Sequence, residues 1–205
     1  MYCGYKKTDQ KGEVKQMKYD VVLAGVGGQG VVSLSQIIAT GAMKDKLKVR
    51  QAEVHGMAQR GGAVISHLRI SDLEIAGDLV PKGAVHLILA TEPLESLRHV
   101  DYLSPDGMIL TSTEPFINIP NYPDKEVLLE KIRKFKNHKL IDAVALAKQA
   151  GAPMATNMVM VGAATKFLPI SKGALIAAIE LLFAAAGKET IEKNIKAFEL
   201  GIQAM

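Results

Sequence analysis

The sequence is poor in cysteine and has no tryptophan: among 205 residues the only cysteine is Cys3. A single thiol cannot form an intrachain disulfide, and it cannot supply the thiolate set of a structural zinc site or an iron–sulfur cluster. We therefore expect no metal site on this chain. Any redox cluster that works with it must belong to another chain.

Long apolar runs are also missing. No run approaches the roughly 20 residues that a membrane-spanning helix needs. The first residues are rich in lysine and contain no apolar signal core. With 48% hydrophobic residues in a chain of this length, we expect one globular domain in the cytoplasm, without membrane association.

Charge of one sign is concentrated at the start of the chain. The formal net charge is +4, and residues 1–18 hold five lysines against Asp9 and Glu13, so only one net positive charge remains for the rest. This segment is polar and aperiodic, so we predict a disordered basic extension over residues 1–18 and a single domain over residues 19–205. The near-neutral body carries no known nucleic-acid motif, so no nucleic-acid partner is expected. Residues 17–20 stand directly before the first predicted strand, so we expect Met17 to be an alternative or the true start of translation.

The most informative stretch begins with an apolar run at residues 21–24, continues through a cluster of glycines and resumes as an apolar segment at residues 31–38. The first run is short, β-branched and uncharged, as in a strand buried on both faces of a parallel sheet. The second has apolar residues at helical spacing. The sequence therefore predicts a strand, a tight loop and a helix.

Within that loop, Gly25, Gly27 and Gly30 form the pattern G-x-G-x-x-G, and Gly28 and Gln29 lie inside it. Glycine permits positive φ, and it lets a ligand approach the backbone and a helix pack closely on a strand. Free N–H groups of the loop and of the helix N-terminus suit a phosphate group. The alternative explanation is that the glycines serve close packing alone. Packing has less need of an exposed backbone without side chains than the approach of a ligand has.

A second glycine-rich segment follows the predicted strand at residues 48–53, and its composition suits neither helix nor strand. Its candidate ligand-binding residues are His55, Gln59, Arg60, Gly61 and Gly62. An arginine offers a rigid set of donors for phosphate or carboxylate, and the glycines after it leave room for a ligand. The alternative is that the histidine and arginine brace a turn.

Glu92 is a further candidate because it follows the predicted strand at residues 85–90, and α/β proteins bind ligands at the carboxyl ends of their strands. It could equally interact with the dipole of the next helix, for which Thr91 is a candidate N-cap.

The remaining pattern alternates strands and helices and ends in three helices, which predicts an α/β fold: a doubly wound, mostly parallel sheet with a Rossmann-like glycine loop and a helical C-terminal part. Further strands are predicted at residues 64–70, 108–111 and 139–142. Further helices are predicted at residues 94–103, 126–135, 143–150, 157–167, 172–186 and 189–203. Residues 175–186 are apolar on nearly all sides, which predicts burial by the body or by another subunit.

Taken together, the two glycine-rich motifs at residues 25–30 and 55–62, with Glu92-Pro93 and with Asn157-Met158 at the start of a late helix, resemble a known family. The resemblance is to the gamma-type subunit of 2-oxoacid:ferredoxin oxidoreductases, especially the small (beta) subunit of the indolepyruvate type. It extends from about residue 19 to the end of the chain.

The resemblance implies a multi-subunit enzyme that oxidatively decarboxylates a 2-oxoacid of the pyruvate or indolepyruvate type, passes electrons to ferredoxin and releases an acyl-CoA. It implies that thiamine diphosphate, magnesium and iron–sulfur clusters are held by large partner subunits, and that this chain is inactive alone and has no catalytic residue of its own. Coenzyme A is a ligand that the chain could share, with its phosphate at the glycine loop and Arg60. The apolar late helices would dock the partner or a second copy of this chain.

Two other classes of function stay open at this point. One is a stand-alone NAD(P)-dependent dehydrogenase, although Glu53, the acidic candidate for the ribose hydroxyl, lies farther along than the roughly 20 residues expected. The other is a nucleotide-binding scaffold module. The identity of the 2-oxoacid and the subunit stoichiometry are not encoded in these motifs.

Overall fold

The computed structural model describes residues 17–55 and 61–205, and a six-stranded sheet in the order β2-β3-β1-β4-β5-β6 organises them. The strands are β1 (Lys18–Val26), β2 (Lys48–His55), β3 (Ala63–Ser71), β4 (Val85–Ala90), β5 (Leu103–Ser112) and β6 (His138–Ile141). The pairs β1–β4, β4–β5 and β5–β6 are parallel, whereas β3 is antiparallel to both β1 and β2. The predicted mostly parallel sheet is confirmed, with β3 as the reversed strand.

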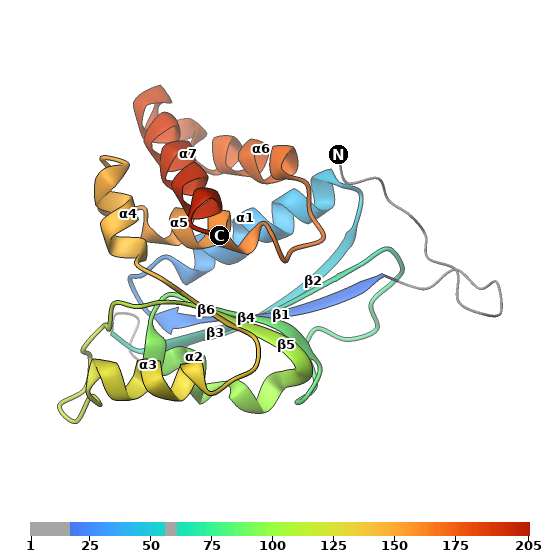
Figure 1. Ribbon diagram of the computed structural model, residues 1–205. Helices are drawn as coiled ribbons and strands as arrows, with labels where there is room; N and C mark the ends of the chain where they lie inside the picture. The colour runs from blue at the N-terminus through green and yellow to red at the C-terminus, as the bar shows by residue number, and fades with distance from the viewer. Residues whose placement is uncertain (1–16, 56–60) are drawn as a thin grey trace.

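Helices cover both faces of the sheet (Figure 1). One layer contains α1 (Val31–Lys44), α4 (Ala143–Gln149), α5 (Thr156–Ala164), α6 (Lys172–Leu182) and α7 (Lys188–Gln203). The other face carries α2 (Pro93–Arg98) and α3 (Lys125–Arg133), with the short 3₁₀ turn η1 (Val100–Tyr102) after α2. The predicted doubly wound α/β architecture with a helical C-terminal part is therefore confirmed.

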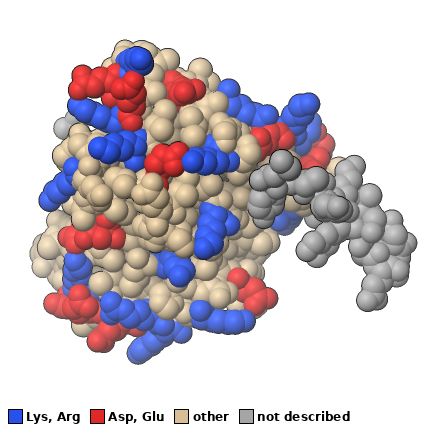
Figure 2. All heavy atoms as spheres, turned by 45° about the horizontal axis from the view of Figure 1, so that its top comes forward, with Lys and Arg blue, Asp and Glu red and all other residues tan. Residues whose placement is uncertain are grey.

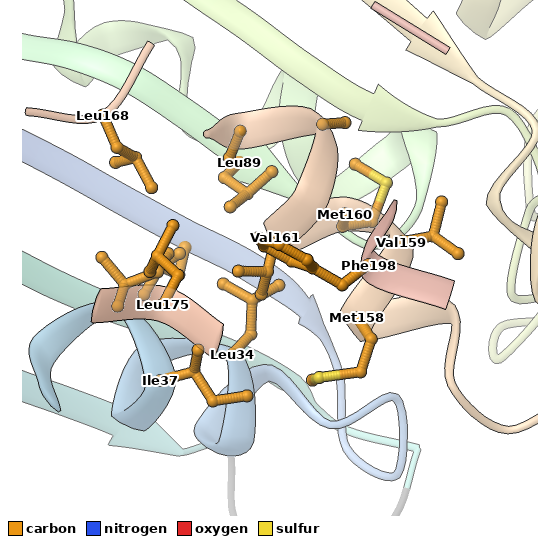
Figure 3. Close-up of a cluster of buried hydrophobic side chains, with 14 of the residues drawn as sticks. Leu34, Ile37, Leu89, Met158, Val159, Met160, Val161, Leu168, Leu175 and Phe198 are labelled. Atoms are coloured by element: carbon orange, nitrogen blue, oxygen red, sulfur yellow. The ribbon is translucent and has the colours of Figure 1, made fainter. Parts of the chain in front are cut away.

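The main apolar core lies between the sheet and the larger helical layer (Figure 3). Leu34 of α1, Leu89 of β4, Met160 of α5, Leu175 of α6 and Phe198 of α7 meet there, and all five are fully buried. Burial of one such side chain stabilises a fold by about 1.5 to 3 kcal/mol. This cluster therefore joins the C-terminal helices to the first strand–helix unit.

The close approach of α5 and α7 depends on glycine. A Cβ added to Gly162 would lie 2.0 Å from the carbonyl oxygen of Phe198, and one added to Gly201 would lie 2.0 Å from that of Val159. Backbone contacts this short leave no space for any side chain at either position. The two helices consequently pack almost backbone to backbone.

Several element bounds differ from those expected. The helix predicted at residues 94–103 ends at Arg98, and the strand predicted at residues 108–111 begins at Leu103. The register between β4 and β5 shifts between Val85 and Leu87, and such a bulge lets the strand continue through Pro105. The apolar helix predicted at residues 172–186 ends at Leu182, and η2 (Ala184–Ala186) follows it.

Positive and negative side chains are interspersed over the face drawn in Figure 2. No helix in the described part of the chain is long and apolar enough to cross a membrane. Residues 1–16 lie outside the described residues, so the basic extension predicted at the N-terminus stays a prediction.

Candidate ligand-binding edge of the sheet

One edge of the sheet gathers most of the candidate residues. β1, β4 and β2 end there, and the antiparallel β3 begins there. The glycine loop at residues 25–30 follows β1, Glu92 lies just after β4, and Gly61 and Gly62 precede β3. His55, the last residue of β2, pairs with Val64 of β3 and so reaches the same edge.

The two glycine-rich segments are joined through their backbones. The N–H of Gly27 donates to the carbonyl of Gly62 over 2.8 Å, and the N–H of Gly61 donates to the carbonyl of Gly27 over 3.2 Å. This reciprocal pair extends the β1–β3 pairing beyond the strands. The motifs that are separate in sequence are thus one structural unit.

The side chain of Gln29 holds the loop in its turn. Its Oε1 accepts the N–H of Val26 over 2.9 Å and the hydroxyl of Thr91 over 2.8 Å. The backbone N–H of Gln29 donates to the carbonyl of Val26 over 3.0 Å. Gln29 therefore shapes the loop through its side-chain amide.

The loop leaves backbone donors open. Among the residues that the structure describes, the N–H groups of Gly28 and Gly30 have no hydrogen-bond partner, and Gly30 caps α1 without a side-chain bond. Gly28 has φ +105°, Gly30 has φ +75°, and a Cβ at Gly28 or Gly61 would meet open space. Open N–H groups at a helix N-terminus form a favourable anion site, because the helix dipole adds partial positive charge there.

Two glycines of the motif are required by close packing. A Cβ at Gly25 would lie 2.0 Å from the Thr91 hydroxyl oxygen, and one at Gly30 would lie 2.5 Å from Nδ2 of Asn157. Asn157 also donates from Nδ2 to the carbonyl of Gly30, over 3.4 Å. The packing explanation therefore applies to Gly25, the ligand explanation to Gly28, and both apply to Gly30.

Glu92 occupies the expected edge but turns toward α2. It is fully buried and caps α2, where its Oε1 accepts the N–H of Glu95, and its Oε2 accepts the hydroxyl of Tyr122. The expectation that Thr91 caps this helix is wrong, because the Thr91 hydroxyl is bonded to Gln29 instead. Burial and the bond to Glu92 raise the pKa of Tyr122, so its hydroxyl stays protonated as a donor.

Glu95, whose N–H donates to Glu92, is itself a buried ionisable residue. Glu95 is 1% exposed, and its Oε1 lies 3.2 Å from Nε of Arg98. Burial raises the pKa of Glu95 to about 7, the charge of Glu92 adds to this rise, and Arg98 opposes it. Burial also lowers the pKa of His99, whose Nε2 lies 3.9 Å from Oε2 of Glu95.

Three residues that shape this edge were not among the ligand-binding candidates from the sequence. Thr91 supports the loop through Gln29, and Asn118 donates from Nδ2 to the carbonyl of Gly61 over 2.8 Å. Tyr122 holds Glu92. Because Thr91 directly follows a predicted strand, the sequence could have indicated that it lies at this edge of the sheet. Asn118 and Tyr122 lie in an aperiodic, proline-containing connection, where the sequence gives no indication of what they contact.

A pocket of about 330 Å³ opens next to the glycine loop, between the beginnings of α1, α5 and α7. Ser33 in the first turn of α1 and Asn157, which contacts Gly30, both line it, together with Phe183 and Lys193. The pocket is therefore adjacent to Gly30 and offers an aromatic surface, while Lys193 is paired with Glu189 over 2.6 Å.

Two candidates cannot be placed, because Gln59 and Arg60 lie outside the described residues. Glu53, the ribose-binding candidate of the dehydrogenase alternative, is paired with Ser66 in the β2–β3 register. Since β3 lies between β1 and β2, Glu53 is not on a strand next to the glycine loop. Among the described residues, no three His, Cys, Asp or Glu side chains form a group that could hold a metal ion.

Comparisons with known proteins agree on one family. Residues 20–204 match the family described as Pyruvate ferredoxin/flavodoxin oxidoreductase. The chain is 35% identical over 197 residues to indolepyruvate oxidoreductase subunit IorB of Pyrococcus horikoshii, and this match covers 91% of the chain and 96% of the relative.

Solved structures share the fold. The gamma subunit of a keto/oxoacid ferredoxin oxidoreductase from Geobacter sulfurreducens superposes with a TM-score of 0.69 at 24% identity, covering 91% of this chain and 97% of that one. A 2-oxoglutarate:ferredoxin oxidoreductase from Magnetococcus marinus, with 2-oxoglutarate, coenzyme A and succinyl-CoA bound, superposes with a TM-score of 0.74 at 20% identity. That match covers 91% of this chain but only 31% of the Magnetococcus chain.

Proposed function

We propose, because this chain belongs to the pyruvate ferredoxin/flavodoxin oxidoreductase family, that it is the gamma-type subunit of a ferredoxin-dependent 2-oxoacid oxidoreductase. The enzyme would decarboxylate a 2-oxoacid oxidatively, reduce ferredoxin and form an acyl-CoA. The observation that carries the proposal is the 35% identity to an indolepyruvate oxidoreductase subunit over nearly the full length of both chains. Aryl pyruvates are accordingly the substrates to test first.

In this proposal the redox chemistry takes place on partner subunits. Thiamine diphosphate, magnesium and iron–sulfur clusters would belong to those larger subunits, since a chain with one cysteine cannot supply the usual thiolate ligands of a cluster. This chain would be inactive alone. Its predicted cytoplasmic location stays a prediction.

The contribution of this chain would be to bind coenzyme A. The open N–H groups of Gly28 and Gly30, with the first turn of α1, would donate hydrogen bonds to a phosphate oxygen, and Arg60 would add a charged donor. The adjoining pocket, with Phe183 and Lys193, gives space for a neighbouring part of the ligand. The Magnetococcus structure, about a third of whose chain shares this fold, has coenzyme A bound, which supports this choice of ligand.

The groups of this chain would act by orientation. Gln29 and the Gly27–Gly62 bond hold the loop before the ligand arrives, so few rotatable bonds become ordered on binding. A coenzyme held by its phosphate would present its thiol end to the partner's thiamine site. Such positioning would raise the effective concentration of the thiol at the partner's active site, without proton transfer by this chain.

The apolar end of α6 is proposed as the surface that meets the partner subunit. Leu181 is 62% exposed and Leu182 36%, and the groove between α1 and α6 that they line also contains Ala178, Gln36 and Thr40, with no charged residue. Exposed apolar surface of this kind is typical of a protein interface. A second copy of this chain is the other candidate occupant.

The ligand assignment is tested by adding one negative charge to the first turn of α1. In the assembled complex, Ser33→Asp places a carboxylate where the phosphate would bind, and calorimetry should show at least tenfold weaker affinity for coenzyme A. The substitution should not lower the stability of the folded protein, because an acidic residue stabilises a helix N-terminus.

Gln203→Glu is the control, because it adds the same charge to an exposed position at the C-terminal end of α7, away from the pocket and from the groove between α1 and α6. It should change the affinity less than twofold. Equal affinities for wild type and Ser33→Asp would contradict the site. Tight NADH binding in place of coenzyme A would favour a dehydrogenase.

A further inference from the structure

The connection between β5 and α3, residues 113–124, crosses the ligand-binding edge of the sheet; we call it the strap. It leaves the end of β5 and reaches Gly61 beside β3, so it passes the ends of β4 and β1, which lie between these strands in the sheet. Near its start, Glu114 forms an ion pair with Lys125, the first residue of α3. Most of its length contains no regular secondary structure.

Two polar contacts attach the strap to the edge. Nδ2 of Asn118 donates to the carbonyl of Gly61 over 2.8 Å, and the hydroxyl of Tyr122 donates to Oε2 of Glu92. By contrast, two of its large apolar residues contribute little burial, since Phe116 is 39% and Ile117 74% exposed. The strap is therefore attached chiefly through groups that contact the surroundings of the glycine loop.

The Asn118 contact leads to the open donor of Gly28 in two steps. Asn118 binds the carbonyl of Gly61, and the N–H of the same residue, which belongs to the preceding peptide group, donates to the carbonyl of Gly27 over 3.2 Å. Because a trans peptide directs its C=O and N–H in opposite directions, fixing the carbonyl of Gly27 toward Gly61 directs the N–H of Gly28 away from it. Asn118 thereby helps to determine where this donor points.

The Tyr122 contact acts on the other side of the loop. Tyr122 holds Glu92, the residue after Thr91, and the Thr91 hydroxyl donates to Oε1 of Gln29. The same oxygen accepts the N–H of Val26 and closes the turn of the glycine loop. The strap is thus connected to both sides of the loop, through a different set of hydrogen bonds on each.

We infer that Asn118 and Tyr122 are positioning residues, which hold the glycine-loop N–H groups in the orientation that binds a phosphate. The inference rests on the proposed function, because it takes coenzyme A as the ligand. Neither residue needs to touch the ligand. Their removal should weaken binding through the loop rather than through a lost ligand contact.

The test compares three variants in the assembled complex. Asn118→Ala and Tyr122→Phe each remove one anchor, whereas Asn121→Ala truncates an exposed residue of the strap for which no hydrogen bond is present among the described residues. Each anchor variant should raise the KM for coenzyme A and its calorimetric Kd about tenfold, with kcat at saturating coenzyme A unchanged. Asn121→Ala should change both constants less than twofold.

A purely structural role would lower the melting temperature and the active fraction, and so kcat, while KM stayed at the wild-type value; that result would overturn the inference. Unchanged KM and Kd in both anchor variants would overturn it as well. If Ser33→Asp also leaves coenzyme A binding unchanged, the phosphate site itself is wrong. If Ser33→Asp abolishes binding and the anchor variants do not affect it, only the role of the strap is wrong.

Discussion

Thr91 donates a hydrogen bond of 2.8 Å to Oε1 of Gln29, and that oxygen also accepts the N–H of Val26 over 2.9 Å. Thr91 follows β4 and Val26 ends β1, so a single amide oxygen joins the ends of two neighbouring strands at the glycine loop. The shape of the loop therefore depends on a residue outside the glycine motif.

Replacing Thr91 with valine should test this dependence, because valine keeps the shape and loses the hydroxyl. Loss of one hydrogen bond in a buried site should destabilise the protein by about 1 kcal/mol and weaken coenzyme A binding severalfold. Chemical unfolding and calorimetric titration measure the two effects. Thr165→Val, which removes a half-buried hydroxyl at the C-cap of α5 away from the loop, is the control and should preserve the affinity. An unaltered affinity in Thr91→Val would show that the loop keeps its shape without this bond.

Gly201→Ala should destabilise the protein by about 1 to 3 kcal/mol, because a Cβ there would lie 2.0 Å from the carbonyl oxygen of Val159 and force α5 and α7 apart. Gly173→Ala in α6 is the matched substitution, since no atom lies within 4 Å of its added Cβ. It should stabilise the protein by about 0.5 to 1 kcal/mol, as alanine favours helix. Urea unfolding of both variants measures the difference, and equal stabilities would refute the close helix contact.

The buried carboxyl of Glu95 should make stability depend on pH. Its pKa is raised from 4.5 to about 7 in the folded protein, chiefly by burial. Between these pH values the folded state holds a proton that the unfolded chain has lost, so the free energy of unfolding should fall as pH rises through this window. The fall should be about 3 kcal/mol and should end above about pH 7.

Glu95→Gln should remove this dependence. The free energy of unfolding of the variant should therefore rise relative to that of the wild type between pH 5 and pH 8. Unfolding titrations at the two pH values test it, with the exposed Glu130→Gln as the control. A wild-type stability that rises over this range, with the same rise in Glu95→Gln, would contradict the raised pKa.

Leu181→Lys should weaken assembly without unfolding the subunit. The side chain is 62% exposed, so a lysine there should change the stability of the isolated chain by less than about 0.5 kcal/mol. A charge buried without a partner at an interface should reduce recovery of the complex in affinity purification. Val127→Lys substitutes an exposed apolar residue of α3, on the opposite face of the sheet, and should leave assembly intact. Equal recovery of the two variants would exclude the end of α6 as the docking surface.

The sequence by itself determined the class of fold and the site of its main loop. The uncharged run at residues 21–24 and the switch to helical spacing after Gly30 are local signals, and both β1 and α1 formed where those signals lie. The helix start after Ser171 was equally predictable, because the Ser171 hydroxyl accepts the N–H of Ala174 as an N-cap. Local signals of this kind arise from backbone conformation and side-chain periodicity, which the neighbouring residues specify.

Only the tertiary structure decided the partners of those elements. The reversal of β3 and its insertion between β1 and β2 separated Glu53 from the glycine loop, and strand order depends on contacts between residues distant in sequence. The same holds for the bond between Asn118 and Gly61 and for the contact between Gly201 and Val159. A glycine or an asparagine in the sequence is compatible with many neighbours, and packing between elements selects the one that it meets.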